Sequence, residues 1–430
     1  MQLVERHIIN RSHPDWAECD RLCAGANAVR NQGLYLQRQS WFYGHGVIRF
    51  GKTEQYKNID NFMQQCNAYR LLPAFLSQQV MMSVNAEWTS FFEAAKAYSL
   101  SPDKFKGRPR PPNYKPRNGR YLVNFPSTRV YKKVISAGII HLSKTLIKIQ
   151  SEHSYDFNCV RIVPACGCYV IEVVYEVGLP ELKSSEYVAA IDLGVNNLAT
   201  VTSNKPGFQP ILVNGRPLKS VNQGFNKFKA ALTSRVKRQS GLDFSRRLEN
   251  LTRRRNHIVD SYLHRATVMI SDVLKSENIS KLVIGLNPNW KNQVELGKRN
   301  NQNFVGIPFR QFISMLEYKL RLLGIEVRVR EESYTSKASF LELDEIPTYG
   351  EKPEGWKSSG RRIQRGLFKS SLGRIINADV NGSYNILRKE FPKAFSKGIE
   401  SVVVAPRKVN VVGFVRFCRL ASKVPYPSPT

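Results

Sequence analysis

Apolar and polar positions divide this chain into a helical first part, a β-rich middle and a mixed second half. Residues 1–10 are typical of a short strand, and apolar residues then recur at helical spacing over residues 15–100. Residues 121–180 predict short strands separated by turns, which suit a small β-barrel. From residue 187 the pattern predicts a β-hairpin, a long helix, and then strands alternating with helices.

An apolar strand that ends in a carboxylate stands out in EYVAAIDLGVNNLATVTS. Apolar residues lead into Asp192, and a glycine and two asparagines precede a second β-rich run. A buried strand that ends in an acid and turns straight back is how RNase H-like nucleases begin their metal-binding active site. On its own the motif is weak, because most such acids are turn residues or helix caps.

Two further segments place acids at the ends of predicted elements. In GIEVRVREESYTSKASF an alternating strand runs out into Glu331 and Glu332, and in RIINADVNGSYNILRK Asp379 precedes a helix whose start is marked by Asn381 and Gly382. Phosphodiester hydrolysis with divalent ions needs carboxylates that converge, and Mg²⁺ favours such hard oxygen ligands. An acid at a helix start can equally be a cap. The three together favour a metal-dependent nuclease.

The charge of the chain indicates a polyanionic partner. It contains 65 Lys and Arg against 34 Asp and Glu, a formal net charge of +31, and its hydrophobic content of 42% is enough for packed cores. Such a surplus is typical of nucleic-acid binding, which should then depend steeply on salt.

Basic residues gather in two segments. SPDKFKGRPRPPNYKPRNGR (101–120) combines charge with prolines and aromatics, so we expect an extended segment laid against a phosphate backbone; a solvated linker is the alternative. The predicted helix over 222–275 is also strongly basic and can line a nucleic-acid channel, or it is an ordinary solvated face. The candidate nucleic-acid-binding residues are Lys104, Lys106, Arg108, Arg110, Lys115, Arg117, Arg253, Arg254 and Lys337.

Neither a secretory leader nor a membrane span is predicted. The first ten residues lack an apolar signal core, and no apolar run approaches the length that crosses a bilayer. The seven cysteines are scattered without zinc spacing, so we expect reduced thiols packed in the core of an intracellular protein.

As a set, these motifs resemble the TnpB (OrfB) family of transposon-encoded proteins, relatives of type V CRISPR effectors and of Fanzor. The resemblance is carried in order by AAIDLGVNNLATV, LVIGLNPNWK, NNQNFVGIPF, EYKLRLLGIEV, EESYTSKASF and NADVNGSYNILRK, and it covers roughly residues 187–390. It implies an α/β protein in which an RNase H-like (RuvC) nuclease domain follows a β-barrel wedge domain with a helical recognition insertion.

The resemblance also implies a domain layout. Its members are the first wedge strand at 1–14, the helical recognition domain at 15–100, the wedge barrel at 101–185, the nuclease domain at 186–390 with an insertion at 341–373, and a C-terminal tail at 391–430.

The implied function is RNA-guided cleavage of DNA beside a short target-adjacent motif, with Mg²⁺ bound by Asp192, Glu332 and Asp379. The implied partners are a guide RNA from the transposon end and target double-stranded DNA. We expect a monomeric ribonucleoprotein in the cytoplasm, associated with the nucleoid of a prokaryote, or in the nucleus if the source is eukaryotic.

Two departures from the family pattern shape the expected site. The usual second acid follows the strand matched by KLVIGLN, where this chain has Gly285. Some relatives carry a compensating glutamate on the neighbouring strand, and Glu332 fits that role, with Glu331 as the competitor on the opposite face. Residues 341–376 contain no cysteine, so we expect no structural zinc there, and the region must fold without metal or stay mobile.

Other functions remain open from the sequence. Gly285 favours a guide-dependent DNA-binding repressor with an inactive nuclease site, and genes of this kind are also read as transposases or their accessory proteins. An RNA-chaperone-like binder is a further alternative, although it leaves the three acids unexplained.

Overall fold

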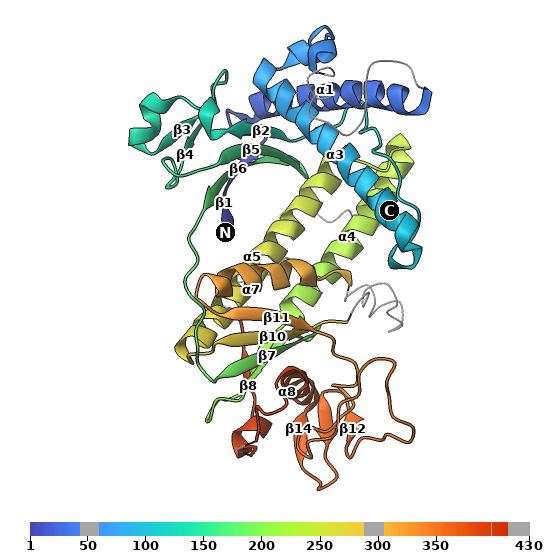
Figure 1. The fold of residues 1–430 in the computed structure, drawn as a ribbon, viewed down its shortest axis with the longest axis vertical. Helices are drawn as coiled ribbons and strands as arrows, with labels where there is room; N and C mark the ends of the chain where they lie inside the picture. The colour runs from blue at the N-terminus through green and yellow to red at the C-terminus, as the bar shows by residue number, and fades with distance from the viewer. Residues whose placement is uncertain (44–59, 288–304, 397, 412–430) are drawn as a thin grey trace. The chain divides into compact units, whose positions relative to one another are not determined.

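The structure is a computed structural model that describes residues 1–43, 60–287, 305–396 and 398–411 (Figure 1). Contacts divide it into two compact units, Met1–Gly178 and Leu179–Thr430. This boundary lies close to the predicted start of the nuclease domain. None of the helices within the described ranges is long and apolar enough to cross a membrane.

An antiparallel sheet forms the base of the first unit. Its order is β1-β6-β5-β2, and β1 pairs with β6 from Gln2 opposite Glu176 to Asn10 opposite Cys168. The first strand therefore joins strands more than a hundred residues away, as the predicted layout requires. The strands are β1 (Gln2–Asn10), β2 (Val123–Pro126), β5 (Cys159–Ala165) and β6 (Cys168–Glu176), with a separate hairpin of β3 (Ile139–His141) and β4 (Lys148–Gln150).

The predicted barrel is not closed by hydrogen bonds among the described strands. The four-stranded sheet ends at β1 and β2, while β3 and β4 pair only with each other in a sheet of their own. Apolar side chains of this hairpin, such as Ile140 and Ile149, instead enter the same core as the larger sheet. Side-chain packing, and not strand pairing, thus joins this hairpin to the larger sheet.

Two long helices cover this sheet, α1 (Trp16–Tyr43) and α3 (Ala74–Leu100). Pro73 precedes α3, as expected of a residue that fits a helix start. The buried thiols of Cys19 and Cys23 belong to the core between α1 and the sheet. Cys166 is exposed at the turn between β5 and β6, so the prediction that every cysteine is packed in the core is wrong for this residue.

The second unit is built on a six-stranded sheet in the order β11-β10-β7-β8-β9-β15. The hairpin predicted at residue 187 is present, and β10 runs parallel to both β7 and β11. The strands are β7 (Val188–Leu193), β8 (Asn197–Ser203), β9 (Ile211–Asn214), β10 (Lys281–Gly285), β11 (Glu326–Arg330) and β15 (Arg407–Val409).

The predicted C-terminal tail (391–430) contains β15, and its residues 412–430 lie outside the described residues. This strand lies parallel to β9 at the edge of the sheet, with Arg407 opposite Ile211. Phe391 and Phe395 also pack against buried residues of the second unit. The three residues of β15, Arg-Lys-Val, are too short a run to be recognised as a strand without the partner that pairs with them.

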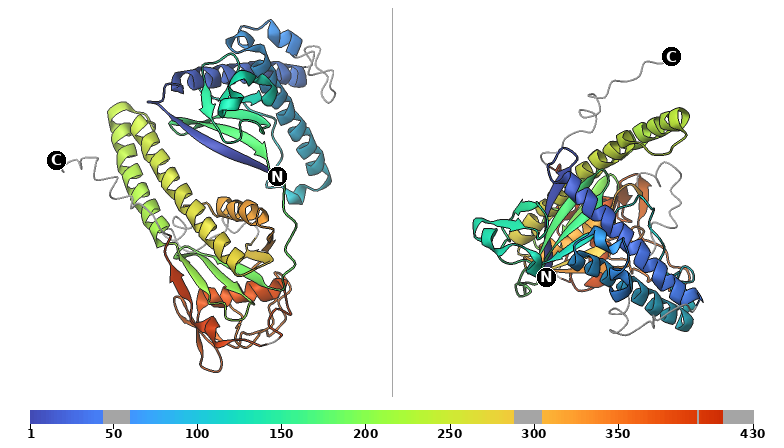
Figure 2. Two further views of the ribbon diagram at one scale, coloured as in Figure 1. Left: turned by 90° about the vertical axis from the view of Figure 1, so that its left-hand side faces the viewer. Right: turned by 90° about the horizontal axis from the view of Figure 1, so that it is seen from above.

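Helices cover the two faces of this sheet (Figure 2, left). The predicted single basic helix is two, α4 (Arg216–Ser240) and α5 (Arg246–Ser276), separated at Gly241 in a left-handed conformation. Helices α5 and α7 (Phe309–Arg321) pack their apolar residues against Ala189, Ile191 and Leu193 of β7.

The other face of the sheet is covered by α8 (Ala378–Glu390), whose Ile386 and Leu387 meet Val188 and Ala190 of β7 and Val283 of β10. Because side chains alternate along a strand, Asp192 and Gly285 belong to this same face. Strand periodicity thus directs the first acid toward α8.

The insertion before α8 forms a small antiparallel sheet of β12 (Arg361–Gln364), β13 (Leu367–Lys369) and β14 (Ile375–Asn377). Phe368 and Ile376 are buried in a cluster with Phe340 and Tyr384. The rings of Phe340 and Tyr384 stack, with centroids 4.3 Å apart. Apolar burial supplies the anchoring of this cysteine-free segment.

A carboxylate closes the loop that leads into the small sheet. Asp344 Oδ2 accepts hydrogen bonds from the backbone N–H of Ser339 at 2.7 Å and of Ser359 at 3.0 Å.

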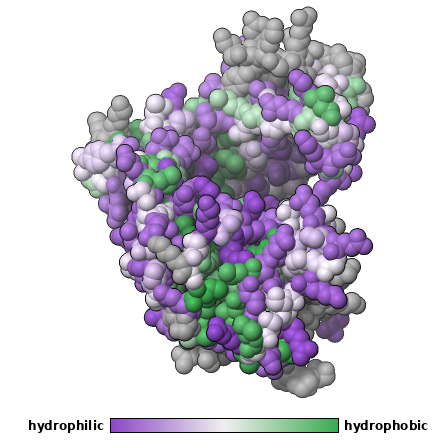
Figure 3. Space-filling view, turned by 60° about the horizontal axis from the view of Figure 1, so that its bottom comes forward, coloured by the Kyte–Doolittle hydropathy of each residue, from purple (hydrophilic) through white to green (hydrophobic). Residues whose placement is uncertain are grey.

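On the face drawn in Figure 3, hydrophilic side chains predominate and apolar ones gather in limited areas.

Candidate active site

Asp192 is the penultimate residue of β7 and lies on the face of the sheet that α8 covers. It pairs with Thr200 of β8, and its side chain faces Gly382 of α8. A Cβ at position 382 would lie 2.9 Å from Asp192 Oδ2. Glycine at this position therefore allows the helix to approach the carboxylate. Gly382, expected to mark the start of the helix, lies inside α8, which begins at Ala378.

Glu332 follows β11, and its side chain turns back over the end of β10. A Cβ at Gly285 would lie only 2.6 Å from Glu332 Oε2. The carboxylate thus takes the space that a side chain at 285 would occupy. Asn287 contacts Glu332 twice: its Oδ1 accepts from the Glu332 backbone N–H at 3.0 Å, and its Nδ2 donates to Oε1 at 3.4 Å.

Glu331, the competing acid, has a different set of partners. Its Oε2 lies 2.5 Å from Nζ of Lys389, whose side chain is 6% exposed, and its Oε1 accepts from the Ser333 backbone N–H. Lys389 also donates to the carbonyl of Ser333 at 3.1 Å. The ion pair holds Glu331 toward the C-terminal end of α8, which supports the prediction that Glu332 is the acid directed at the site.

Asp379 lies in the first turn of α8. The helix begins at Ala378 and is capped by Asn377, whose Oδ1 accepts from the N–H groups of Asp379 and Val380 at 3.0 and 3.2 Å. The cap is therefore Asn377, and the Asp379 carboxylate is left for another partner. Asn197 of β8 donates to Asp379 Oδ2 at 2.7 Å.

The three acids interact electrostatically. Burial, followed by the negative charges of Glu332 and Asp379, raises the pKa of Asp192 well above its ordinary value. Burial and the nearby charge of Glu331 raise the pKa of Glu332 to about 7, against the opposing effect of Lys389. Clustered, desolvated carboxylates of this kind are typical of sites that take up a cation.

The donor set suits a hard divalent cation, since three carboxylates come from β7, the end of β11 and α8. The acids act on one another electrostatically without converging tightly. Within the described ranges, no group of three or more His, Cys, Asp or Glu side chains is gathered closely enough to hold a metal ion.

Arg362 lies near the site, although no motif in the sequence indicates it. It lies on β12, and its positive charge partly offsets the rise in the pKa of Asp192. Nothing in the sequence near Arg362 distinguishes it from the neighbouring Arg361 and Arg365, because its proximity to Asp192 arises only when the small sheet folds. Asn197 and Asn287 were also missed, although each lies a few residues from a candidate position in the sequence.

The segment after Glu332 is fixed by amides of α8. Asn381 donates to the carbonyl of Ala338 at 2.8 Å and accepts from the N–H of Phe340 at 2.9 Å. Asn385, one turn later, donates to the carbonyls of Thr335 and Ala338. Lys337 lies on this fixed turn with its side chain exposed, as a phosphate contact requires.

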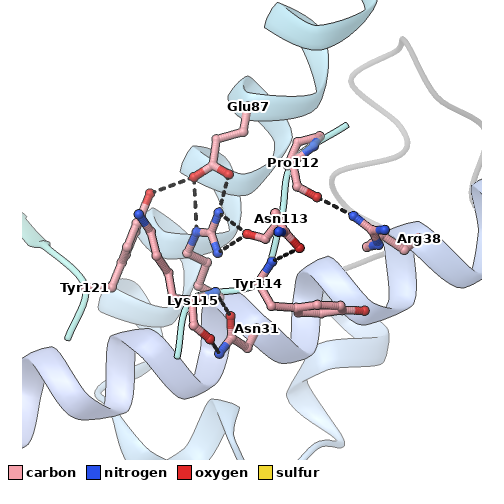
Figure 4. A network of polar contacts seen from close by, with 9 residues as sticks. Asn31, Arg38, Glu87, Pro112, Asn113, Tyr114, Lys115 and Tyr121 are labelled. Carbon is pink, nitrogen blue, oxygen red and sulfur yellow. Dashed lines mark hydrogen bonds and ion pairs between the residues drawn. The ribbon is translucent and has the colours of Figure 1, made fainter. Parts of the chain in front are cut away.

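The basic segment of the first unit is held along α1 by its backbone (Figure 4). Asn31 exchanges two hydrogen bonds with the backbone of Lys115, each 3.0 Å long, and Arg38 donates to the carbonyl of Pro112 at 2.6 Å. Asn27 donates to the carbonyl of Pro116 at 2.9 Å. The segment is therefore not a loose linker.

The centre of this contact is Arg30, whose side chain is 4% exposed. It donates to both carboxylate oxygens of Glu87, at 3.1 and 2.6 Å, and to the carbonyl of Asn113 at 3.2 Å. All six predicted basic contacts on this segment are exposed: Lys104, Lys106, Arg108, Arg110, Lys115 and Arg117.

The two arginines predicted on the long helices lie on α5. Arg254 is exposed, and Arg253 is half-buried and donates to Asn250 at 3.2 Å. Their neighbour Arg255 has a structural role, since it donates to Asn222 of α4 at 2.9 Å and to the carbonyl of Gly306. The basic residues of α5 therefore include one that packs against α4, Arg255, and one that lies on the surface, Arg254.

Comparisons with known proteins agree with this architecture. A family model described as a probable transposase, OrfB_IS605, matches residues 168–290, and a Cas12f1-like TNB domain model matches residues 309–386. The two models match consecutive parts of the second half of the chain and support a TnpB-like family. The first of these segments contains Asp192 and Gly285, and the second contains Glu332 and Asp379.

A curated relative is the CRISPR-associated endodeoxyribonuclease Cas12f2 of Micrarchaeota archaeon (strain CG1_02_47_40), 24% identical over 272 residues. The match covers 61% of this chain and about half, 47%, of the relative. Among solved structures, a Cas12f1–sgRNA–target DNA complex matches with a TM-score of 0.51 and 13% identity, over 85% of this chain and 81% of that one. This likeness shows a shared fold.

Proposed function

We propose that this protein is an RNA-guided DNA endonuclease of a transposable element, which cuts DNA beside a short target-adjacent motif. The observation that carries the proposal is the set of acids on the α8 side of the sheet, where Glu332 and Asp379 both raise the pKa of the buried Asp192. The match to the OrfB_IS605 model and the net charge of +31 support a nucleic-acid substrate.

In this proposal Asp192, Glu332 and Asp379 hold Mg²⁺, and Asn197 and Asn287 orient two of them. The chemistry that bound Mg²⁺ supplies is activation of a water molecule and stabilisation of the leaving oxygen. Arg362 faces the same site from the small sheet, where its charge can attract the scissile phosphate. Exposed Lys337 lies close by on the turn fixed by α8.

The decisive experiment is plasmid cleavage by the purified ribonucleoprotein, with a guide designed from sequencing of the RNA that copurifies. We expect Mg²⁺-dependent cutting of the matched target. Asp192→Ala and Asp379→Ala should abolish cutting and leave guided DNA binding nearly intact. Cutting at the full rate by Glu332→Ala, together with its loss in Glu331→Ala, would reverse the glutamate assignment.

The exposed basic residues are proposed to hold guide and target phosphates. Replacing Lys104 and Lys106, or Arg108 and Arg110, by glutamine should weaken binding of every sequence alike. Each lost phosphate contact should reduce the dependence of log affinity on log salt by about one. An unchanged salt slope would assign these side chains to the solvated surface.

A second candidate is a guide-dependent DNA-binding protein with an inactive nuclease site, which Gly285 favours. It predicts tight guided binding with no cutting by the wild type at any Mg²⁺ or Mn²⁺ concentration. Strand transfer by protein that purifies free of RNA would instead indicate a transposase.

A further inference from the structure

We infer that Gly285 and Asn287, at the end of β10, form a seat that positions the Glu332 carboxylate for metal binding. The inference rests on the proposed function, because it concerns the same acids. It adds that the uncharged residues Gly285 and Asn287 determine the position of the Glu332 carboxylate, which follows another strand. Neither residue touches the reacting atoms, so both are positioning residues.

The first part of the seat is the absence of a side chain at Gly285. Strand β10 lies between β7 and β11, so a side chain that crosses from the end of β11 toward Asp192 must pass over position 285. A Cβ there would lie 2.6 Å from Glu332 Oε2 and 2.4 Å from Ile386 Cδ1. Real Cβ atoms do not approach other atoms so closely, so any side chain at 285 must displace Glu332, Ile386 or both.

The second part is a polar clamp two residues further on. Asn287 accepts from the Glu332 backbone N–H at 3.0 Å and donates to its carboxylate at 3.4 Å. One side chain thus fixes both ends of the glutamate. A neutral donor orients the carboxylate and leaves its negative charge available to a cation, whereas a lysine or arginine in this place would neutralise it.

The third part keeps the neighbouring acid away. Lys389 binds Glu331 at 2.5 Å and the carbonyl of Ser333 at 3.1 Å, so the backbone on both sides of Glu332 is held. The seat therefore explains why the missing acid at position 285 and the acid at 332 belong together. An acid at 285 and an acid at 332 would compete for the same volume.

The test measures metal binding at the site itself. Fe²⁺ replaces Mg²⁺ at hard oxygen sites and, with ascorbate and peroxide, cleaves the polypeptide backbone around its position. We expect cleavage of the full ribonucleoprotein near residues 192, 332 and 379. Asn287→Ala and Gly285→Ala should each raise the Fe²⁺ concentration for half-maximal cleavage about 10- to 100-fold, the usual effect of removing a residue that orients a metal ligand.

Two matched controls separate positioning from folding. Asn204 makes a similar pair of contacts at the other end of β7, accepting from the Val188 N–H at 2.8 Å and donating to the Glu186 carbonyl at 3.3 Å. Gly178 has open space around its Cβ position. Asn204→Ala and Gly178→Ala should keep wild-type Fe²⁺ dependence. Thermal melts of all variants show whether folding is retained.

A double variant removes the remaining ambiguity at position 285. Ile386→Val deletes the Cδ1 atom that the new Cβ would meet, so Gly285→Ala with Ile386→Val leaves chiefly the conflict with Glu332. This variant should still lose Fe²⁺ binding. If Asn287→Ala fails to fold, this double variant still tests whether Gly285 is needed to position Glu332.

DNA cutting gives the second readout. Raised Mn²⁺ should restore cutting by Asn287→Ala, in which the acid is present but misplaced, and should not restore Glu332→Ala. The inference is overturned if Asn287→Ala and the double variant bind Fe²⁺ as the wild type does, or if Fe²⁺ cleaves nowhere near these acids. If the Fe²⁺ pattern is as expected and guided DNA stays uncut, the proposed function fails and the seat stands.

Discussion

Arg30 offers a direct test of how the basic segment of the first unit is held. Replacing it by alanine removes two hydrogen bonds to Glu87 and leaves the carbonyl of Asn113 without this donor. Breaking a buried ion pair costs about 3–5 kcal/mol. Glu87 is 30% exposed and keeps the hydroxyl of Tyr121 as a donor at 3.0 Å, so we expect the lower end, about 3 kcal/mol.

The assay is thermal and chemical unfolding, followed by hydrogen exchange of the segment. In a unit of this size about 3 kcal/mol corresponds to a fall in Tm of roughly 6–12 °C. Exchange should accelerate at Tyr114 and Lys115, whose backbone the network fixes. Guide binding should then weaken more at high salt, because the exposed cations lose their fixed arrangement.

Arg21→Ala is the matched control on the same helix. Its ion pair with Glu18 is exposed, with the arginine side chain 51% accessible, so the loss should stay below about 1 kcal/mol. Equal melting temperatures of Arg30→Ala and Arg21→Ala would refute the reasoning. So would an Arg30→Ala protein that unfolds early while Tyr114 and Lys115 stay protected from exchange.

Three further predictions concern the second unit. In metal-free protein the raised pKa of Glu332, about 7 against an ordinary 4.5, means that its protonated form contributes stability that is present below pH 4.5 and lost as pH rises through 7; Glu332→Gln should therefore raise the unfolding free energy at pH 8 by about 3 kcal/mol and change it little at pH 4, as urea titrations in EDTA would show, and equal gains at both pH values would contradict this. Phe368→Ala, at a side chain 1% exposed, should lower the unfolding free energy by about 3–5 kcal/mol, whereas a zinc chelator should leave the melt unchanged; a chelator-induced fall in Tm would reveal a metal in the insertion. Asn381→Ala leaves the carbonyl of Ala338 and the N–H of Phe340 without this partner and should cost about 1–3 kcal/mol, with faster exchange at Phe340; an unchanged exchange rate there would argue against the anchoring role of α8.

The sequence alone was enough to place the three acids at the ends of elements. The apolar run of β7, the alternation along β11 and the polar start of α8 are local patterns, so they can be recognised without tertiary contacts. The family resemblance was confirmed, and the predicted hairpin is present in the sheet of the second unit. The roles of the acids stay predictions that the geometry supports.

Tertiary structure decided which neighbours each acid has. Glu331 and Glu332 are adjacent in sequence, and only packing against α8 gives one a lysine and the other an asparagine and the space over Gly285. Arg362 reaches the field of Asp192 only because the small sheet folds beside α8, and β15 becomes a strand only because β9 offers it an edge. Side-chain periodicity is a property of the local backbone, whereas such pairings join residues that the chain separates by tens to hundreds of positions.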